Sequence, residues 1–193
     1  RLYATTLGDA LAVVDVGRAR ERVLFERYLR LLGNNATVSQ QLLFPERIEL
    51  SPADGRLMAE IREELSSLGF EFSANGPAGV TAENGPADNK GAGEGVTYEI
   101  TGIPPELPAG MVQDALHEAI ARVRELGGVP ESEKVRDLAA ILARRGASGA
   151  AKIDEAAVAP LLDELASCNE PAFTPSGRAV LIRITREELT KRF

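Results

Sequence analysis

The sequence predicts an α+β fold, in which strands and helices are mixed without regular β-α-β alternation. Short apolar or alternating runs at residues 11–14, 70–73 and 96–100 have the pattern of strands. Longer segments at residues 18–32 and 109–126 carry apolar side chains at helical spacing. Hydrophobic residues make up 44% of the 193 residues and charged residues 26%, which is typical of a globular protein with a real core.

The first half of the chain divides into elements at clear signals. The run at 11–14 predicts a buried strand, and the helix at 18–32 ends at Gly33, because glycine tolerates positive φ. Residues 40–50 are predicted to be extended, with Pro45 indicating an edge strand or an exposed bend. Ser51 and Pro52 are typical of the N-cap and first turn of a helix, which we expect to continue to Gly69.

The second half follows the same logic. Residues 75–95 are rich in Gly, Ala, Pro, Asn and Asp and predict a mobile hairpin loop between strands at 70–73 and 96–100. Helices are expected at 109–126 and 133–145 with a break at 127–130, and Asp154 is expected to cap another helix. A strand at 178–184 precedes a last helix, for which Thr185 and Glu188 form a capping box.

Charge and composition exclude several classes of function. The net charge is −7 and the sequence pI about 4.9, which argues against strong autonomous DNA binding, although arginines crowd the helix at 18–32. One cysteine, Cys168, excludes an internal disulfide framework and suits a reducing compartment. No apolar run approaches the roughly 18–20 residues that span a bilayer, so we expect no membrane contact. Because the chain begins at Arg1 rather than Met, we interpret it as an excerpt of a longer protein.

Asp15, Glu21 and Glu26 form the first candidate site. An aspartate at a strand end followed by glutamates on the next helix could gather carboxylates around a divalent metal. Glu21 and Glu26 are five positions apart, or about 140° around a helix, so at best Asp15 and Glu21 converge. From chemistry alone we favour ion pairs of Glu21 with Arg18, and of Glu26 with Arg22 or Arg30.

These residues also carry a resemblance to the C-terminal dimerisation domain of MutL-type DNA mismatch-repair proteins. The family's nuclease motif is Asp-Gln-His-Ala, two residues, Glu, four residues, Glu; this chain keeps the three carboxylates but has Val16, Gly17 and Arg18 after Asp15. The family's second motif, Cys-Pro-His-Gly-Arg, here reads Thr174-Pro175-Ser176-Gly177-Arg178. A third family segment, a cysteine followed by basic residues, falls around residues 143–145 without its cysteine.

The missing residues are the imidazole and thiolate groups that hold zinc-like ions. The resemblance therefore implies a vestigial endonuclease motif, with no tight metal site and at most weak Mn²⁺ or Mg²⁺ binding by Asp15 and Glu21. We expect Gly177 and Arg178 to form a turn before the last strand. Cys168 and the single histidine, His117, are interpreted as a structural residue and a surface residue rather than ligands.

Residues 40–45 form the second candidate site. Gln40, Leu43, Phe44 and Pro45 have the form of a peptide that docks extended into a hydrophobic cleft. In nuclease-type MutL proteins a similar hexapeptide contacts the replication sliding clamp, and the resemblance implies the same contact here. The alternative is an ordinary strand whose Leu42 and Phe44, or Leu43, enter the core.

The resemblance implies a dimerisation subdomain at residues 1–37 and 131–193, and an inserted external or regulatory subdomain at 38–130. We expect a homodimer, with residues 11–14 and 180–184 as candidates for the interface. The predicted function is dimerisation and recruitment of other mismatch-repair proteins, without enzyme activity or a cofactor in this fragment. ATP and Mg²⁺ would bind an upstream ATPase region, and DNA would be held weakly or through the full-length protein.

Two alternatives stay open. One is a divalent-metal nicking endonuclease with an altered site around Asp15, Glu21 and Glu26. The other is a ligand-binding regulatory domain outside the family. In the favoured interpretation the protein is bacterial, cytoplasmic and associated with the nucleoid.

Overall fold

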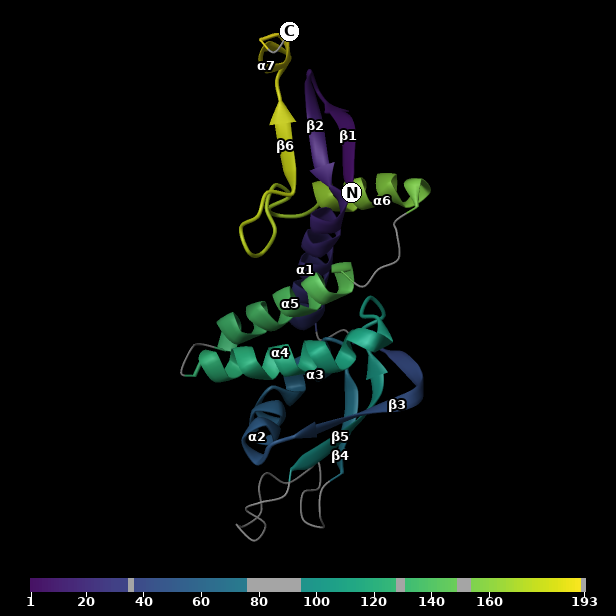
Figure 1. Cartoon of the computed structure of the whole chain (residues 1–193), viewed down its shortest axis with the longest axis vertical. Helices are drawn as coiled ribbons and strands as arrows, with labels where there is room; N and C mark the ends of the chain where they lie inside the picture. Colours follow the sequence, from purple (N-terminus) through teal and green to yellow (C-terminus); the bar gives the residue numbers. More distant parts are fainter. Residues whose placement is uncertain (35–36, 76–94, 128–130, 149–153, 192–193) are drawn as a thin grey trace.

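The computed structural model describes residues 1–34, 37–75, 95–127, 131–148 and 154–191, and the mixture of helices and strands that the sequence predicted is confirmed (Figure 1). The described strands form two separate three-stranded antiparallel sheets. The sheets lie toward opposite ends of an elongated molecule, with helices between them (Figure 1). Among the described residues, no helix is both long and apolar enough to cross a membrane.

The first sheet has the order β1-β2-β6, from β1 (Leu2–Leu7), β2 (Ala10–Asp15) and β6 (Leu181–Ile184). We did not predict β1, which pairs with β2 through a tight turn at Gly8, where φ is +63°. The predicted last strand is shorter than expected and begins at Leu181. Thr185 and Glu188 form the predicted capping box at the start of α7 (Arg186–Thr190).

The second sheet has the order β3-β5-β4, from β3 (Gln40–Leu50), β4 (Glu71–Asn75) and β5 (Val96–Ile103). The Ser51 hydroxyl accepts the backbone N–H of Asp54, so the predicted N-cap is confirmed. The single helix that we expected from there to Gly69 was wrong. It is divided into α2 (Pro52–Glu60) and α3 (Arg62–Ser67), because Ile61 has φ −99° and ψ 18°, outside helical geometry.

The remaining α-helices are α1 (Val16–Asn34), α4 (Val112–Glu125), α5 (Glu131–Ser148) and α6 (Val158–Ala166), and short 3-10 helices η1 (Ala109–Met111) and η2 (Glu155–Ala157) precede α4 and α6. Helix α1 runs from the first sheet toward the second (Figure 1). Its Ala19 and Val23 pack in a small core with residues of β2, α6 and the segment before β6. Its Leu24, Phe25 and Tyr28 pack in a larger core with the second sheet, α4 and α5. Helix α1 therefore belongs to both cores.

The two sheets fall on either side of the predicted subdomain boundaries at residues 38 and 130. Helix α5 lies in the part that we assigned to the dimerisation subdomain, yet it packs in the larger core beside α4. The division into subdomains therefore stays a prediction. Of the predicted mobile loop at 75–95, residues 76–94 lie outside the described residues.

Candidate functional site

Asp15 ends β2 and closes the first turn of α1. Its Oδ1 accepts the backbone N–H of Arg18 at 3.1 Å, and its Oδ2 lies 3.4 Å from Arg18 Nε. An acceptor at this position satisfies one of the N–H groups that a helix start leaves unpaired. The side chain of Asp15 thus has a local structural role.

The segment Thr174–Arg178 forms the turn that we predicted before the last strand. Gly177 donates its N–H to the Thr174 carbonyl at 2.9 Å, and its φ of +79° is a conformation that favours glycine. Thr174 is buried; its hydroxyl accepts the Arg178 N–H at 3.1 Å and lies 3.0 Å from the Ser176 hydroxyl. The two side chains that stand where the family has cysteine and histidine therefore bond to each other.

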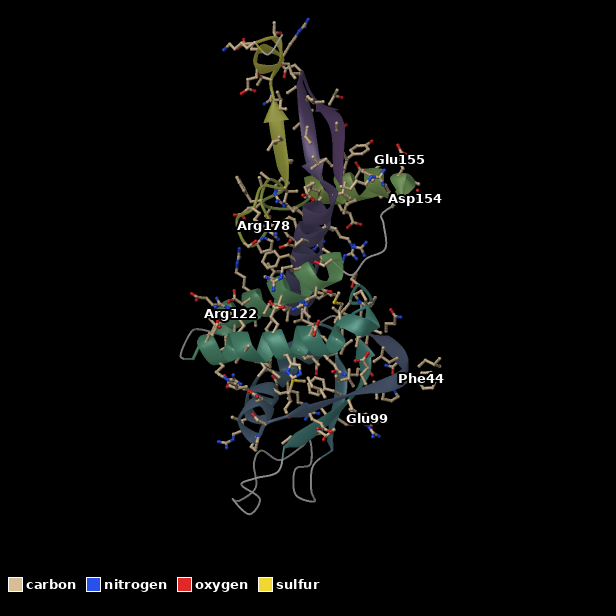
Figure 2. All side chains as sticks on the ribbon, viewed as in Figure 1. Phe44, Glu99, Arg122, Asp154, Glu155 and Arg178 are labelled. Atoms are coloured by element: carbon tan, nitrogen blue, oxygen red, sulfur yellow. The ribbon has the colours of Figure 1, made fainter. Side chains whose placement is uncertain are left out.

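Glu21 brings the two motifs together. Arg178 Nη2 donates to Glu21 Oε2 at 2.8 Å, although the residues are 157 positions apart (Figure 2 labels Arg178 beside α1). The Glu21 residue is only 6% exposed, whereas the Arg178 side chain is 50% exposed. The predicted pairing of Glu21 with Arg18 was wrong, because Arg18 pairs with Asp15 instead.

Glu26 lies in a separate buried cluster. It accepts from Arg22 Nη2 at 2.7 Å, as predicted, and also from the backbone and side-chain N–H groups of Asn169 at 2.9 and 3.0 Å. Arg22 is 3% exposed and also reaches Glu170 at 3.3 Å. Nothing in the sequence around Asn169 indicated this contact.

The three carboxylates fit a divalent ion poorly. Each is held by a different arginine, and a guanidinium already supplies the positive charge that a metal would bring. Within the described ranges, no three His, Cys, Asp or Glu side chains gather closely enough to bind a metal. In this structure Asp15, Glu21 and Glu26 are thus engaged by three separate arginines rather than gathered around one point.

Burial governs the titration of Glu21. Desolvation raises the pKa of its carboxyl above the ordinary 4.5, and the charges of Arg178, Arg144 and Arg18 offset this only in part. Since the folded-state pKa is raised, the stability that this carboxyl contributes is present below about pH 4.5 and lost as the pH rises through the folded value.

A pH series of urea unfolding checks this prediction. Glu21→Gln lacks the titration, so its stability relative to the wild type is expected to become more favourable between pH 4.5 and neutrality. Parallel pH curves for the two proteins would contradict the assignment. Glu164→Gln, which replaces an exposed carboxyl paired with Arg27, is the control.

A cleft of about 410 Å³ adjoins Glu21, between α1, α4, α5 and the turn before β6. Arg144, Pro175 and Ser176 line it, so all three family segments meet there. We did not predict the wall that α4 supplies, where Glu118 pairs with both Arg144 and Arg145. His117 on the same helix is exposed, in agreement with the prediction of a surface residue.

Three of the four predicted clamp-binding residues, Leu43, Phe44 and Pro45, bulge from β3, whereas Gln40 pairs with Ile103 of β5. The β3–β5 pairing shifts register between Gln41 and Glu46, so the intervening residues oppose only one residue of β5. Leu43 is 88% exposed and Phe44 78% exposed, and Figure 2 shows Phe44 pointing away from the body of the molecule. Of Leu42, Leu43 and Phe44, only Leu42 packs against the larger core. The alternative that placed Leu42 and Phe44, or else Leu43, in the core is therefore right for Leu42 and wrong for Leu43 and Phe44.

The first sheet also has an exposed apolar face. In an antiparallel sheet, paired residues share a face. The register places Ala4, Val13 and Ile182 in one row and Thr6, Leu11 and Ile184 in the next. Ile182 is 52% exposed and Leu2, on the same face, 70% exposed, whereas Ala12 and Val14 on the other face are buried. We call the face formed by Leu2, Ala4, Leu11, Val13, Ile182 and Ile184 the outward face.

Comparison with known proteins places these features in a protein family. Residues 3–95 match the model of the MutL C terminal dimerisation domain, and the resemblance to this family that the sequence indicated is confirmed. The chain is 30% identical to the DNA mismatch repair protein MutL of Bacteroides fragilis over 200 residues, which is 100% of this chain and 28% of that protein. It is 32% identical over 184 residues to the MutL proteins of Pelodictyon phaeoclathratiforme and Chlorobaculum tepidum, covering 95% of this chain and 26% and 27% of theirs. The chain thus spans less than a third of the length of these relatives.

Proposed function

We propose that this chain is the homodimerisation and partner-recruitment part of a longer DNA mismatch-repair protein, and that its nuclease site is degenerate. The observation that carries the proposal is the outward face of the first sheet. An exposed apolar face of three strands is unusual on a monomer and is the kind of surface that two copies bury across a two-fold axis. Both strand segments that we expected at the interface, 11–14 and 180–184, contribute to it.

Light scattering coupled to size exclusion tests this proposal across a dilution series. The chain has a mass of 20.6 kDa, and a species of about twice that mass is expected to persist to micromolar concentration. A monomer at high concentration would sink the proposal.

The degenerate nuclease site is supported by the ion pairs of Asp15, Glu21 and Glu26. Each carboxylate is engaged by an arginine, and Thr174 and Ser176 supply hydroxyls where the family has soft ligands. We therefore expect no nicking of supercoiled DNA with Mn²⁺. Nicking that disappears in Asp15→Asn would establish the alternative, a nuclease with an altered site.

Partner recruitment is proposed for Gln40 and for the bulge at Leu43, Phe44 and Pro45. Contact with water is unfavourable for the large apolar side chains of Leu43 and Phe44, which are both exposed. Docking into a hydrophobic cleft on the replication sliding clamp would remove that contact. The bulge is held at its base by Gln41, which donates to Glu71 at 2.7 Å, so little order has to be gained on binding.

Replacing both side chains tests this recruitment. Leu43→Ala with Phe44→Ala is expected to weaken binding to a purified sliding clamp by at least about tenfold, since each is an apolar anchor. The unfolding midpoint should not change, because both side chains are exposed. Val38→Ala, which removes another exposed apolar side chain outside the bulge, is the control. Equal clamp binding by all three proteins would exclude this surface.

The relatives' length leaves room for further regions in a whole protein. We propose that ATP and Mg²⁺ bind in such a region upstream, and that DNA and other mismatch-repair proteins are contacted through the whole protein. With its single cysteine, the chain suits the reducing bacterial cytoplasm, and nucleoid association would follow from DNA contact.

A further inference from the structure

Strand β6 needs support from outside its own sheet. It has four residues and, among the strands that the structure describes, pairs only with β2. So short an edge strand contributes few hydrogen bonds and is the kind of element that opens locally. Yet it supplies Ile182 and Ile184, two of the six side chains of the outward face.

The segment leading into β6 is fastened at several points. Val180 donates its N–H to the Ala172 carbonyl at 2.7 Å and accepts the N–H of Asp15 at 2.8 Å. These bonds fix its backbone against the end of β2. They involve main-chain atoms, so they do not depend on which side chains stand at these positions.

Two side-chain contacts from α1 add to them. Arg178 donates to the buried Glu21 at 2.8 Å, and Arg18 Nη1 donates to the Ala179 carbonyl at 2.8 Å. Arg18 and Glu21 are three positions apart and therefore lie on one face of α1, toward the same strand approach. Helix α1 thus forms hydrogen bonds with Arg178 and Ala179, the two residues directly before Val180.

We propose that Glu21, Arg178 and Arg18 are positioning residues for dimerisation: they hold β6 in register against β2, so that Ile182 and Ile184 complete the outward face. The inference rests on the proposed homodimer and names what maintains its surface. It also assigns a present role to Glu21 and Arg178, which resemble nuclease-motif residues, without any metal.

The test compares dimer dissociation constants, measured by sedimentation or light scattering over a dilution series. Arg178→Gln removes the ion pair with Glu21 and is expected to raise the dissociation constant of the dimer by about tenfold. Arg183→Gln is the matched control: it lies on β6 itself, but its ion pair with Asp9 is exposed, so a change of less than about twofold is expected. Hydrogen exchange of the amides of β6 should become faster in Arg178→Gln and not in the control.

A conservative variant separates positioning from general destabilisation. Arg178→Lys keeps a positive donor for Glu21, whereas Arg178→Gln does not, so Arg178→Lys is expected to retain most of the dimer affinity that Arg178→Gln loses. If Arg178→Gln matches Arg183→Gln in both readouts while the wild type dimerises, the positioning role is overturned and the homodimer stands. If the wild type is a monomer, the proposed function fails and this inference fails with it.

Discussion

Ile182→Asp is expected to convert the dimer into a monomer. Ile182 lies in the same row as Val13 and Ala4, in the outward face. A carboxylate there would be buried against the second copy without a partner, and an uncompensated buried charge costs several kcal/mol. At about 4 kcal/mol the dimer dissociation constant rises about a thousandfold.

Leu7→Asp is the matched control for this experiment. Leu7 is 54% exposed, close to the 52% of Ile182, and is also an apolar residue of the first sheet. It pairs with Ala10 and therefore lies on the opposite face. Light scattering should report a dimer for Leu7→Asp and a monomer for Ile182→Asp, each with native circular dichroism. Dimers in both would place the interface elsewhere.

Arg22→Met is expected to have the largest effect on the free energy of unfolding. Arg22 is 3% exposed and its partner Glu26 only 10% exposed at the side chain, so removing the guanidinium leaves a buried carboxylate with only the two Asn169 bonds. Breaking a buried ion pair in this way costs about 3–5 kcal/mol. Urea unfolding measures the loss.

Two further variants test whether the loss of stability in Arg22→Met comes from the unpaired Glu26 carboxylate. Arg30→Met on the same helix removes an exposed guanidinium and should change the free energy of unfolding by at most about 0.5 kcal/mol. Arg22→Met with Glu26→Leu removes both charges and should recover most of the loss, since Nε and Nη1 of Arg22 are themselves buried without partners. A double variant no more stable than Arg22→Met would contradict this account.

The elements that follow from local chemistry were predictable from the sequence. Ser51 and Thr185 cap helices because their hydroxyls accept N–H groups three residues on, and such contacts depend only on nearby residues. Gly177 marks its turn for the same reason, through its positive φ. The pairing of Arg22 with Glu26 is one helical turn long and was likewise predicted.

The features missed in the sequence depend on contacts between distant segments. The sequence of β1 alternates only weakly between apolar and polar residues. It forms a strand because its backbone pairs with the edge of β2. The pairing of Glu21 with Arg178 joins residues that no local spacing relates, so helical spacing pointed to Arg18. The bulge at Leu43 and Phe44 could be inferred from Pro45 as an exposed bend, but its size comes from the register with β5.

Helix α1 has a mechanical consequence. The first half of α1 packs in the small core and its second half in the large one. Unfolding at either end of the molecule would therefore expose apolar side chains of the same helix to water. Melting should therefore proceed as a single cooperative transition rather than in two stages.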